Sequence, residues 1–103
     1  MYDALDSILT QSATEVDGLL HIAGVGARDL ADAYGTPLIA YDAEHVRSAA
    51  RAWTDAFAGY ERDVLIAYAT KAFSSVGLLR LLGELGIGAD VASEGELLVA
   101  TKA

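Results

Sequence analysis

The chain has 103 residues, 53% of them hydrophobic, and no cysteine, which excludes a disulfide framework and thiolate chemistry. Fifteen acidic residues against seven basic ones give a net charge of -8, which disfavours nucleic acid and anionic membrane surfaces as partners. The acidic start, Met1 to Asp6, lacks the positive region of a signal peptide, and every apolar run is shorter than the roughly 18 residues that cross a bilayer. We therefore expect a cytoplasmic protein without a membrane-bound segment.

The first third of the chain gives weak signals for regular structure. The expected elements are a helix over residues 2–10, a polar connector over 11–18, a strand over 19–25 and a helix over 29–34. Gly35 follows the last of these and is a typical helix stop. The pair Gly24 and Gly26 lacks the third glycine of a dinucleotide-binding fingerprint, so we interpret it as a turn.

From residue 36 onward, the pattern alternates between strands and helices. The expected elements are an extended segment over 38–41, a helix capped by Asp42, a strand over 64–69, a helix from about Ser75, a strand over 88–92 and a helix over 97–103. Trp53 and Phe57 are one helical turn apart and are expected in the core. Strands joined by helices of this length favour a parallel sheet with right-handed crossovers.

Lys71 is the residue with the clearest chemical potential. It follows the run Val64 to Thr70, in which the period of two predicts Leu65, Ala67, Ala69 and Lys71 on one face. The small side chains leave room beside the amine, and a desolvated amine at a strand end can form a Schiff base with a carbonyl. The alternative is a lysine that extends from the strand end into water.

Three segments resemble, in order and spacing, the N-terminal part of pyridoxal-phosphate decarboxylases with an alanine-racemase-like barrel. They are YGTPLIAYD (34–42), YATKAF (68–73) and GADVASEGEL (88–97). Diaminopimelate decarboxylases are the members that they resemble most. Two residues depart from the family pattern, because Phe73 stands where many members have asparagine and Glu94 stands where glycine is common. Neither departure concerns the lysine.

The resemblance implies an α/β fold. Residues 36–103 would form the first β/α units of a pyridoxal-phosphate-binding (β/α)8 barrel, and residues 1–35 would contribute a helix and strand segment to a second, β-rich domain. A complete barrel takes about 250 residues, so we expect the chain to be an incomplete fragment.

The resemblance also implies a cofactor site. Lys71 would carry pyridoxal 5'-phosphate as a Schiff base, Ala69 would line the pocket, and Asp90 would lie near the lysine in the cofactor pocket. Glu96 would also lie near the pocket, although Ser93 and Glu96 fit the S-x-x-E spacing of a helix capping box, which we expect to be its main role. His21 and His45 have no partner at metal-ligand spacing, so no metal site is predicted.

The implied activity is decarboxylation of an amino acid, with meso-diaminopimelate converted to L-lysine and carbon dioxide in lysine biosynthesis. The full-length enzyme would be a homodimer. Later strands and the second subunit would supply the residues that bind the cofactor's phosphate group and the acid that protonates the product. The isolated chain would therefore be inactive. Two alternatives stay open: another barrel enzyme of this type, such as an ornithine, arginine or carboxynorspermidine decarboxylase or an amino-acid racemase, or a non-catalytic relic of the barrel.

Overall fold

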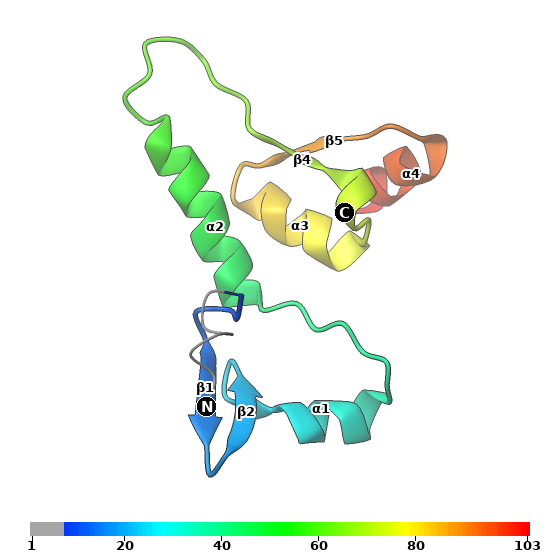
Figure 1. Cartoon of the computed structure of the whole chain (residues 1–103). Coiled ribbons are helices and arrows are strands. Elements are labelled where there is room, and N and C mark those ends of the chain that lie inside the picture. The colour runs from blue at the N-terminus through cyan, green and yellow to red at the C-terminus, as the bar shows by residue number, and fades with distance from the viewer. Residues whose placement is uncertain (1–7) are drawn as a thin grey trace. The chain divides into compact units, whose positions relative to one another are not determined.

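The computed structural model describes residues 8–103, which form two compact units divided between His45 and Val46 (Figure 1). Most of the helix expected over residues 2–10 lies outside the described residues. Within residues 8–103, no helix has the combination of length and apolar character that crossing a membrane requires.

The first unit contains a small antiparallel sheet. Its strands are β1 (Ala13–Val16), β2 (Leu19–Ile22) and β3 (Val25–Gly26), paired in the order β1-β2-β3. Each of the two connections has two residues at positive φ, with values of 52° and 76° at Asp17-Gly18 and 51° and 78° at Ala23-Gly24. Positive φ at both central residues is typical of type I′ hairpin turns.

These hairpins correct two predictions. Residues 11–18 do not form a connector, because β1 occupies half of that segment and a hairpin turn follows it. Residues 19–25 do not form one strand, because the turn at Ala23-Gly24 divides them into β2 and the start of β3. The Asp17-Gly18 pair is a strong hairpin signal, since glycine adopts positive φ without a steric penalty.

The helices that follow match the predictions. Helix α1 (Ala27–Tyr34) ends at Gly35, whose amide donates to the Ala31 carbonyl. Helix α2 (Ala43–Ala56) begins after Asp42, and one oxygen of this carboxylate accepts from the amides of Glu44 and His45 at 2.9 and 3.2 Å. Asp42 is therefore the N-cap that the sequence predicts. In the part of the chain that the structure describes, residues 38–41 do not form a strand.

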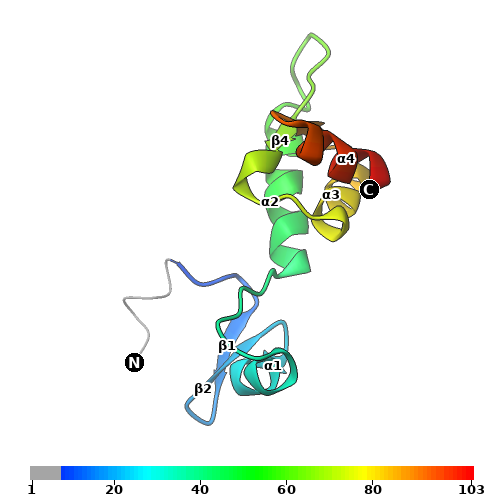
Figure 2. The same cartoon turned by 90° about the vertical axis from the view of Figure 1, so that its right-hand side faces the viewer.

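The second unit contains a parallel strand pair, β4 (Ala67–Ala69) and β5 (Gly88–Asp90). Helix α3 (Val76–Glu84) connects the strands, and α4 (Glu94–Lys102) follows β5 and lies beside α3 (Figures 1 and 2). Both strands are shorter than predicted, although the Gly88 amide also donates to the Ile66 carbonyl at 2.8 Å, just before β4 begins. The parallel pairing through a helix confirms the predicted β/α alternation in this unit.

The core of the second unit is small. Its buried members are Ala50, Leu79, Leu82 and Ile87. The prediction that Trp53 and Phe57 lie in the core is wrong, because the two side chains are 61% and 40% exposed. Helical spacing identifies part of the apolar face of α2 correctly, since Ala50 is in the core and Val46 packs against it, but Trp53 and Phe57 stay exposed within the described residues.

Candidate functional site

Lys71 lies directly after β4, in a short 3-10 helix, η1 (Thr70–Ala72), and its side chain is exposed. The prediction that strand alternation extends to Lys71 is wrong, since the strand ends at Ala69. The backbone turns at this point instead of continuing in an extended conformation. Lys71 nevertheless lies at the carboxyl end of a parallel strand, where ligands bind in α/β barrels.

The two faces of the β4–β5 pair differ in character. Ile66 and Tyr68 pack against the core, so alternation places Ala67 and Ala69 on the opposite face. Ala67 pairs in register with Gly88, and Ala69 pairs with Asp90. The face away from the core therefore carries very small side chains beside the Lys71 turn, with the exposed Asp90 at its carboxyl edge.

Thr70 is the most buried side chain at this edge, with 0% of its surface exposed. Its hydroxyl lies 2.8 Å from Oε2 of Glu96 and 2.9 Å from the carbonyl oxygen of Asp90, both of which are acceptors. Thr70 thus links the end of β4 to the end of β5 and to α4. The sequence analysis missed this residue, although a polar residue in step with Ile66 and Tyr68 faces the core and needs an acceptor there.

Glu96 is half-buried in the first turn of α4 and takes part in several hydrogen bonds. The Ala92 amide donates to Oε2 at 2.7 Å, and the Glu96 amide donates to the Ser93 hydroxyl oxygen at 3.2 Å. The serine arm of the predicted capping box is confirmed. The Ala92 amide and the Thr70 hydroxyl, with smaller contributions from the Ser93 amide and the charge of Lys71, hold the pKa of Glu96 below its ordinary value.

The predicted site residues therefore come together at one edge of the strand pair. Lys71, Ala69, Asp90 and Glu96 all lie at or next to the carboxyl ends of β4 and β5, and the Lys71 charge acts on Glu96. Within residues 8–103, no group of three histidine, aspartate or glutamate side chains could hold a metal ion. The arrangement places one exposed amine and two carboxylates at the same edge of the strand pair.

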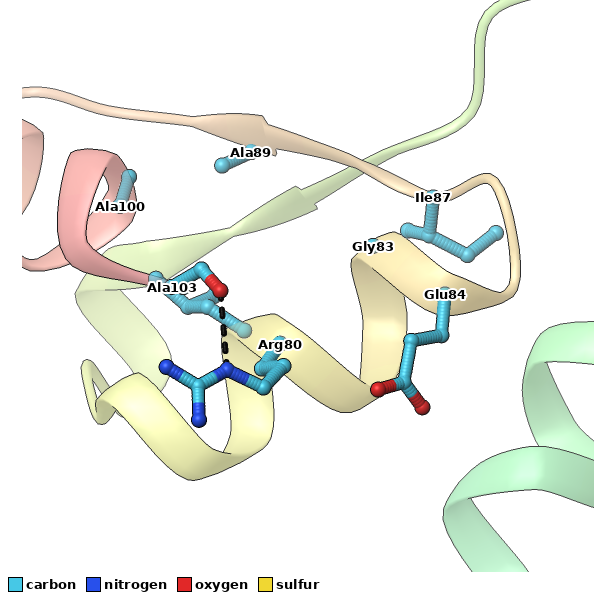
Figure 3. Close-up of a pocket in the computed structure, with 8 residues that line it drawn as sticks. Arg80, Gly83, Glu84, Ile87, Ala89, Ala100 and Ala103 are labelled. Atoms are coloured by element: carbon cyan, nitrogen blue, oxygen red, sulfur yellow. Dashed lines mark hydrogen bonds between the residues drawn. The ribbon is translucent and has the colours of Figure 1, made fainter.

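A separate hollow of about 470 Å³ lies on the other side of the sheet (Figure 3). Its lining comes from α3, α4 and the start of β5, including Arg80, Glu84, Ile87 and Ala89. Arg80 donates from Nε to the Ala103 carbonyl at 3.0 Å and closes one side of the hollow (Figure 3). Lys71 does not line it, so we do not assign this hollow to the lysine site.

Comparison with known proteins identifies the class of this fold and site. Residues 43–103 match the family described as pyridoxal-dependent decarboxylase, pyridoxal binding domain. The chain therefore belongs to this family, whose cofactor is pyridoxal phosphate.

The relatives are named diaminopimelate decarboxylase. Those from Aquifex aeolicus and Bacillus subtilis are 46% and 45% identical over 87 and 86 residues, in each case 84% of this chain and 20% of the relative. A crystal structure of the enzyme from Methanocaldococcus jannaschii, in complex with L-lysine, matches with a TM-score of 0.81 and 35% identity, covering 89% of this chain and 22% of that one. The chain spans about one fifth of the length of these relatives.

The residues at the carboxyl ends of β4 and β5 fit the family's cofactor. Covalent attachment requires an accessible amine, and Lys71 is exposed. A planar ring requires a flat surface with little side-chain bulk, which Ala67, Ala69 and Gly88 provide. Carboxylates beside a cationic nitrogen stabilise its charge, and Asp90 and Glu96 are at the same edge.

Proposed function

We propose that this chain is the N-terminal piece of a diaminopimelate decarboxylase, which releases carbon dioxide from meso-diaminopimelate and yields L-lysine. The observation that carries the proposal is the exposed Lys71, on a turn at the carboxyl end of a parallel strand, within the sequence YATKA. The names of the relatives support the substrate, and the L-lysine complex of the Methanocaldococcus jannaschii enzyme fits lysine as product.

Residues 36–103 are, in this proposal, the first β/α units of a (β/α)8 barrel, and residues 1–35 contribute to a second, β-rich domain. The parallel β4–β5 pair with its helical crossover supports the first assignment. The antiparallel β1-β2-β3 sheet supports the second. The exposure of Trp53 and Phe57 fits a helix that packs against further parts of a larger fold.

Lys71 would bind the cofactor covalently through Nζ, with Ala69 against the ring and Asp90 and Glu96 near the nitrogen. Pyridoxal phosphate, when bound, supplies the electron sink that accepts the electrons left when carbon dioxide departs. When it is not bonded to the cofactor, Nζ of Lys71 would be free to hold a proton near the reacting carbon. The groups that grip the phosphate and protonate the product belong to other parts of the enzyme.

The remaining partners follow from the same assignment. We propose an amino acid as the substrate, a homodimer for the complete enzyme and the cytoplasm as its location, with no nucleic acid partner. The net charge of -8 supports the proposal that nucleic acid is not a partner. We expect the isolated chain not to turn over substrate, because the proposal assigns phosphate binding and product protonation to later strands and to a second subunit.

The test is a substrate panel on a protein of the length of these relatives that carries this segment. We expect carbon dioxide release from meso-diaminopimelate and little or none from ornithine, arginine or carboxynorspermidine. Release only from one of the other substrates would place the enzyme elsewhere in the family. Racemisation without release, or no activity with any cofactor-loaded sample, would contradict the decarboxylase assignment.

A further inference from the structure

The Lys71 turn is held by side-chain hydroxyl groups on both sides of the lysine. On one side, the Thr70 hydroxyl reaches Glu96 and the Asp90 carbonyl at 2.8 and 2.9 Å. On the other side, the Tyr68 hydroxyl donates to the Phe73 carbonyl at 3.2 Å. Lys71 is thus enclosed between two hydrogen-bonded anchors, while its own side chain is exposed.

Burial makes Thr70 the stronger anchor. Its side chain has no exposed surface, so water cannot reach the hydroxyl group and take the place of its protein acceptors. Its hydroxyl has one proton to share between a carboxylate oxygen and a carbonyl oxygen, and a bond to a carboxylate is the stronger kind. The same oxygen of Glu96 is fixed by the Ala92 amide at 2.7 Å.

We propose that Thr70 is a positioning residue for Lys71: it fastens the turn after β4 to the end of β5 and the start of α4, and Tyr68 secures the far side of the turn. This role requires no contact between either hydroxyl and the cofactor. The two hydroxyls act by fixing the backbone from which the Lys71 amine extends, so that Nζ meets a carbonyl in a constant direction. This inference rests on the proposed role of Lys71 and adds the residues that set its geometry.

The chain contains a built-in reference for testing this proposal, because its only lysines are Lys71 and Lys102. Lys102 is exposed at the end of α4. A complete enzyme that carries this segment is incubated with pyridoxal 5'-phosphate, reduced with borohydride and digested, and mass spectrometry gives the ratio of labelled Lys71 to labelled Lys102. The ratio cancels differences in reagent and time.

Thr70→Val keeps the volume of the side chain and removes the hydroxyl. We expect it to lower the ratio by about tenfold, because small misplacements of a reacting group have large effects on rate. Thr70→Ser restores the hydroxyl and should restore most of the ratio. Thr101→Val is the matched control, since the exposed Thr101 hydroxyl bonds only to the Leu98 carbonyl of its own helix, and it should leave the ratio unchanged.

An unchanged ratio in folded Thr70→Val would overturn the proposal. If Thr70→Val does not fold, Tyr68→Phe decides, because it keeps the ring against the core and removes only the second anchor. A smaller fall in its ratio supports the proposal, and an unchanged ratio contradicts it. A wild-type ratio near one would contradict the proposed function, because Lys71 would then react no better than Lys102. A high wild-type ratio that stays high in the variants would contradict only the positioning role of Thr70 and Tyr68.

Discussion

Two carboxylates, Asp42 in the first unit and Glu96 in the second, have similar surroundings and different consequences. Each accepts from a hydroxyl that is distant in sequence, Ser12 for Asp42 and Thr70 for Glu96, and each also accepts from backbone amides. In both cases, these hydrogen bonds hold the pKa of the carboxyl group below its ordinary value, the Ser12 hydroxyl acting most strongly on Asp42 and the Ala92 amide on Glu96.

The difference lies in what each carboxylate fastens. Asp42 caps α2 with its own oxygen, and Ser12 in turn accepts from the Ala23 amide at 3.0 Å, so this cluster ties a hairpin to a helix start. At α4 the capping acceptor is Ser93, and the carboxylate of Glu96 is left to reach Thr70 and Ala92. The same chemistry joins a hairpin to a helix start in the first unit and, in our proposal, holds the Lys71 turn in the second.

The largest expected effect comes from removing the lysine. In a complete enzyme that carries this segment, Lys71→Ala should abolish both decarboxylation and the visible absorbance of the attached cofactor, since it removes the amine that we propose as the site of attachment. Lys102→Ala is the matched control and should change neither. Absorption spectroscopy and carbon dioxide release measure the two properties, and an unchanged spectrum in Lys71→Ala would remove Lys71 from its role.

Thr70→Val should also reduce stability more than Ser12→Ala does. Thr70 has no exposed surface and valine would fill the same volume, so water cannot take the place of the hydroxyl that donates to the Asp90 carbonyl. Ser12 is only partly buried, so water can replace its hydroxyl and the loss should be smaller. Urea unfolding of the two variants, followed by circular dichroism, gives the loss in the free energy of unfolding for each. Equal losses would show that burial does not distinguish the Thr70–Glu96 contact from the Ser12–Asp42 contact.

The contact between Ser12 and Asp42 in the first unit provides a negative control for the labelling of Lys71. Ser12→Ala weakens the contact with Asp42 but leaves Thr70, Glu96 and Tyr68 intact. We expect the labelling ratio of Lys71 to Lys102 to stay within about twofold of the wild-type value, since additivity holds for sites that share no partners. A fall as large as that of Thr70→Val would mean that the ratio reports general loosening and not the position of the turn.

The smallest effects are shifts in titration. Because the folded-state pKa values of Asp42 and Glu96 are lowered from 3.8 and 4.5, their stabilising contributions are present above those values and are lost as pH falls through the folded values. Thr70→Val should raise the pKa of Glu96 and leave that of Asp42 unchanged, and Ser12→Ala should do the reverse. Carbon-detected NMR titration of the carboxyl groups measures both pKa values. A changed pKa of Asp42 in Thr70→Val, or of Glu96 in Ser12→Ala, would contradict the independence of the two contacts.

Local sequence signals predicted the helices well. Asp42, Ser75 and Ser93 cap α2, α3 and α4, and Gly86 follows α3 at a φ of 77°, a conformation that suits glycine. These features depend on a few neighbouring residues, so the sequence contains them directly. The short strands and the end of β4 depend on partners instead, and their boundaries were predicted less well.

The sequence predicted that the proposed site residues lie near one another, but it did not predict Thr70 or the local geometry. The motif resemblance identified Lys71, Asp90 and Glu96, and the structure brings all three to one edge. The pattern did not predict the turn at Thr70, because this turn is fixed by hydrogen bonds to residues 20 and 26 positions further on. Periodicity describes which face a residue occupies, whereas a long-range hydrogen bond determines where the strand ends.

The central claim is that Lys71 is the amine that holds pyridoxal phosphate. Borohydride reduction of the cofactor-loaded enzyme, followed by peptide mapping, tests it most directly. We expect the reduced cofactor on the peptide that contains Lys71, with the peptide that contains Lys102 essentially unmodified. Finding the cofactor on Lys102, or on a lysine outside this segment, would contradict the account.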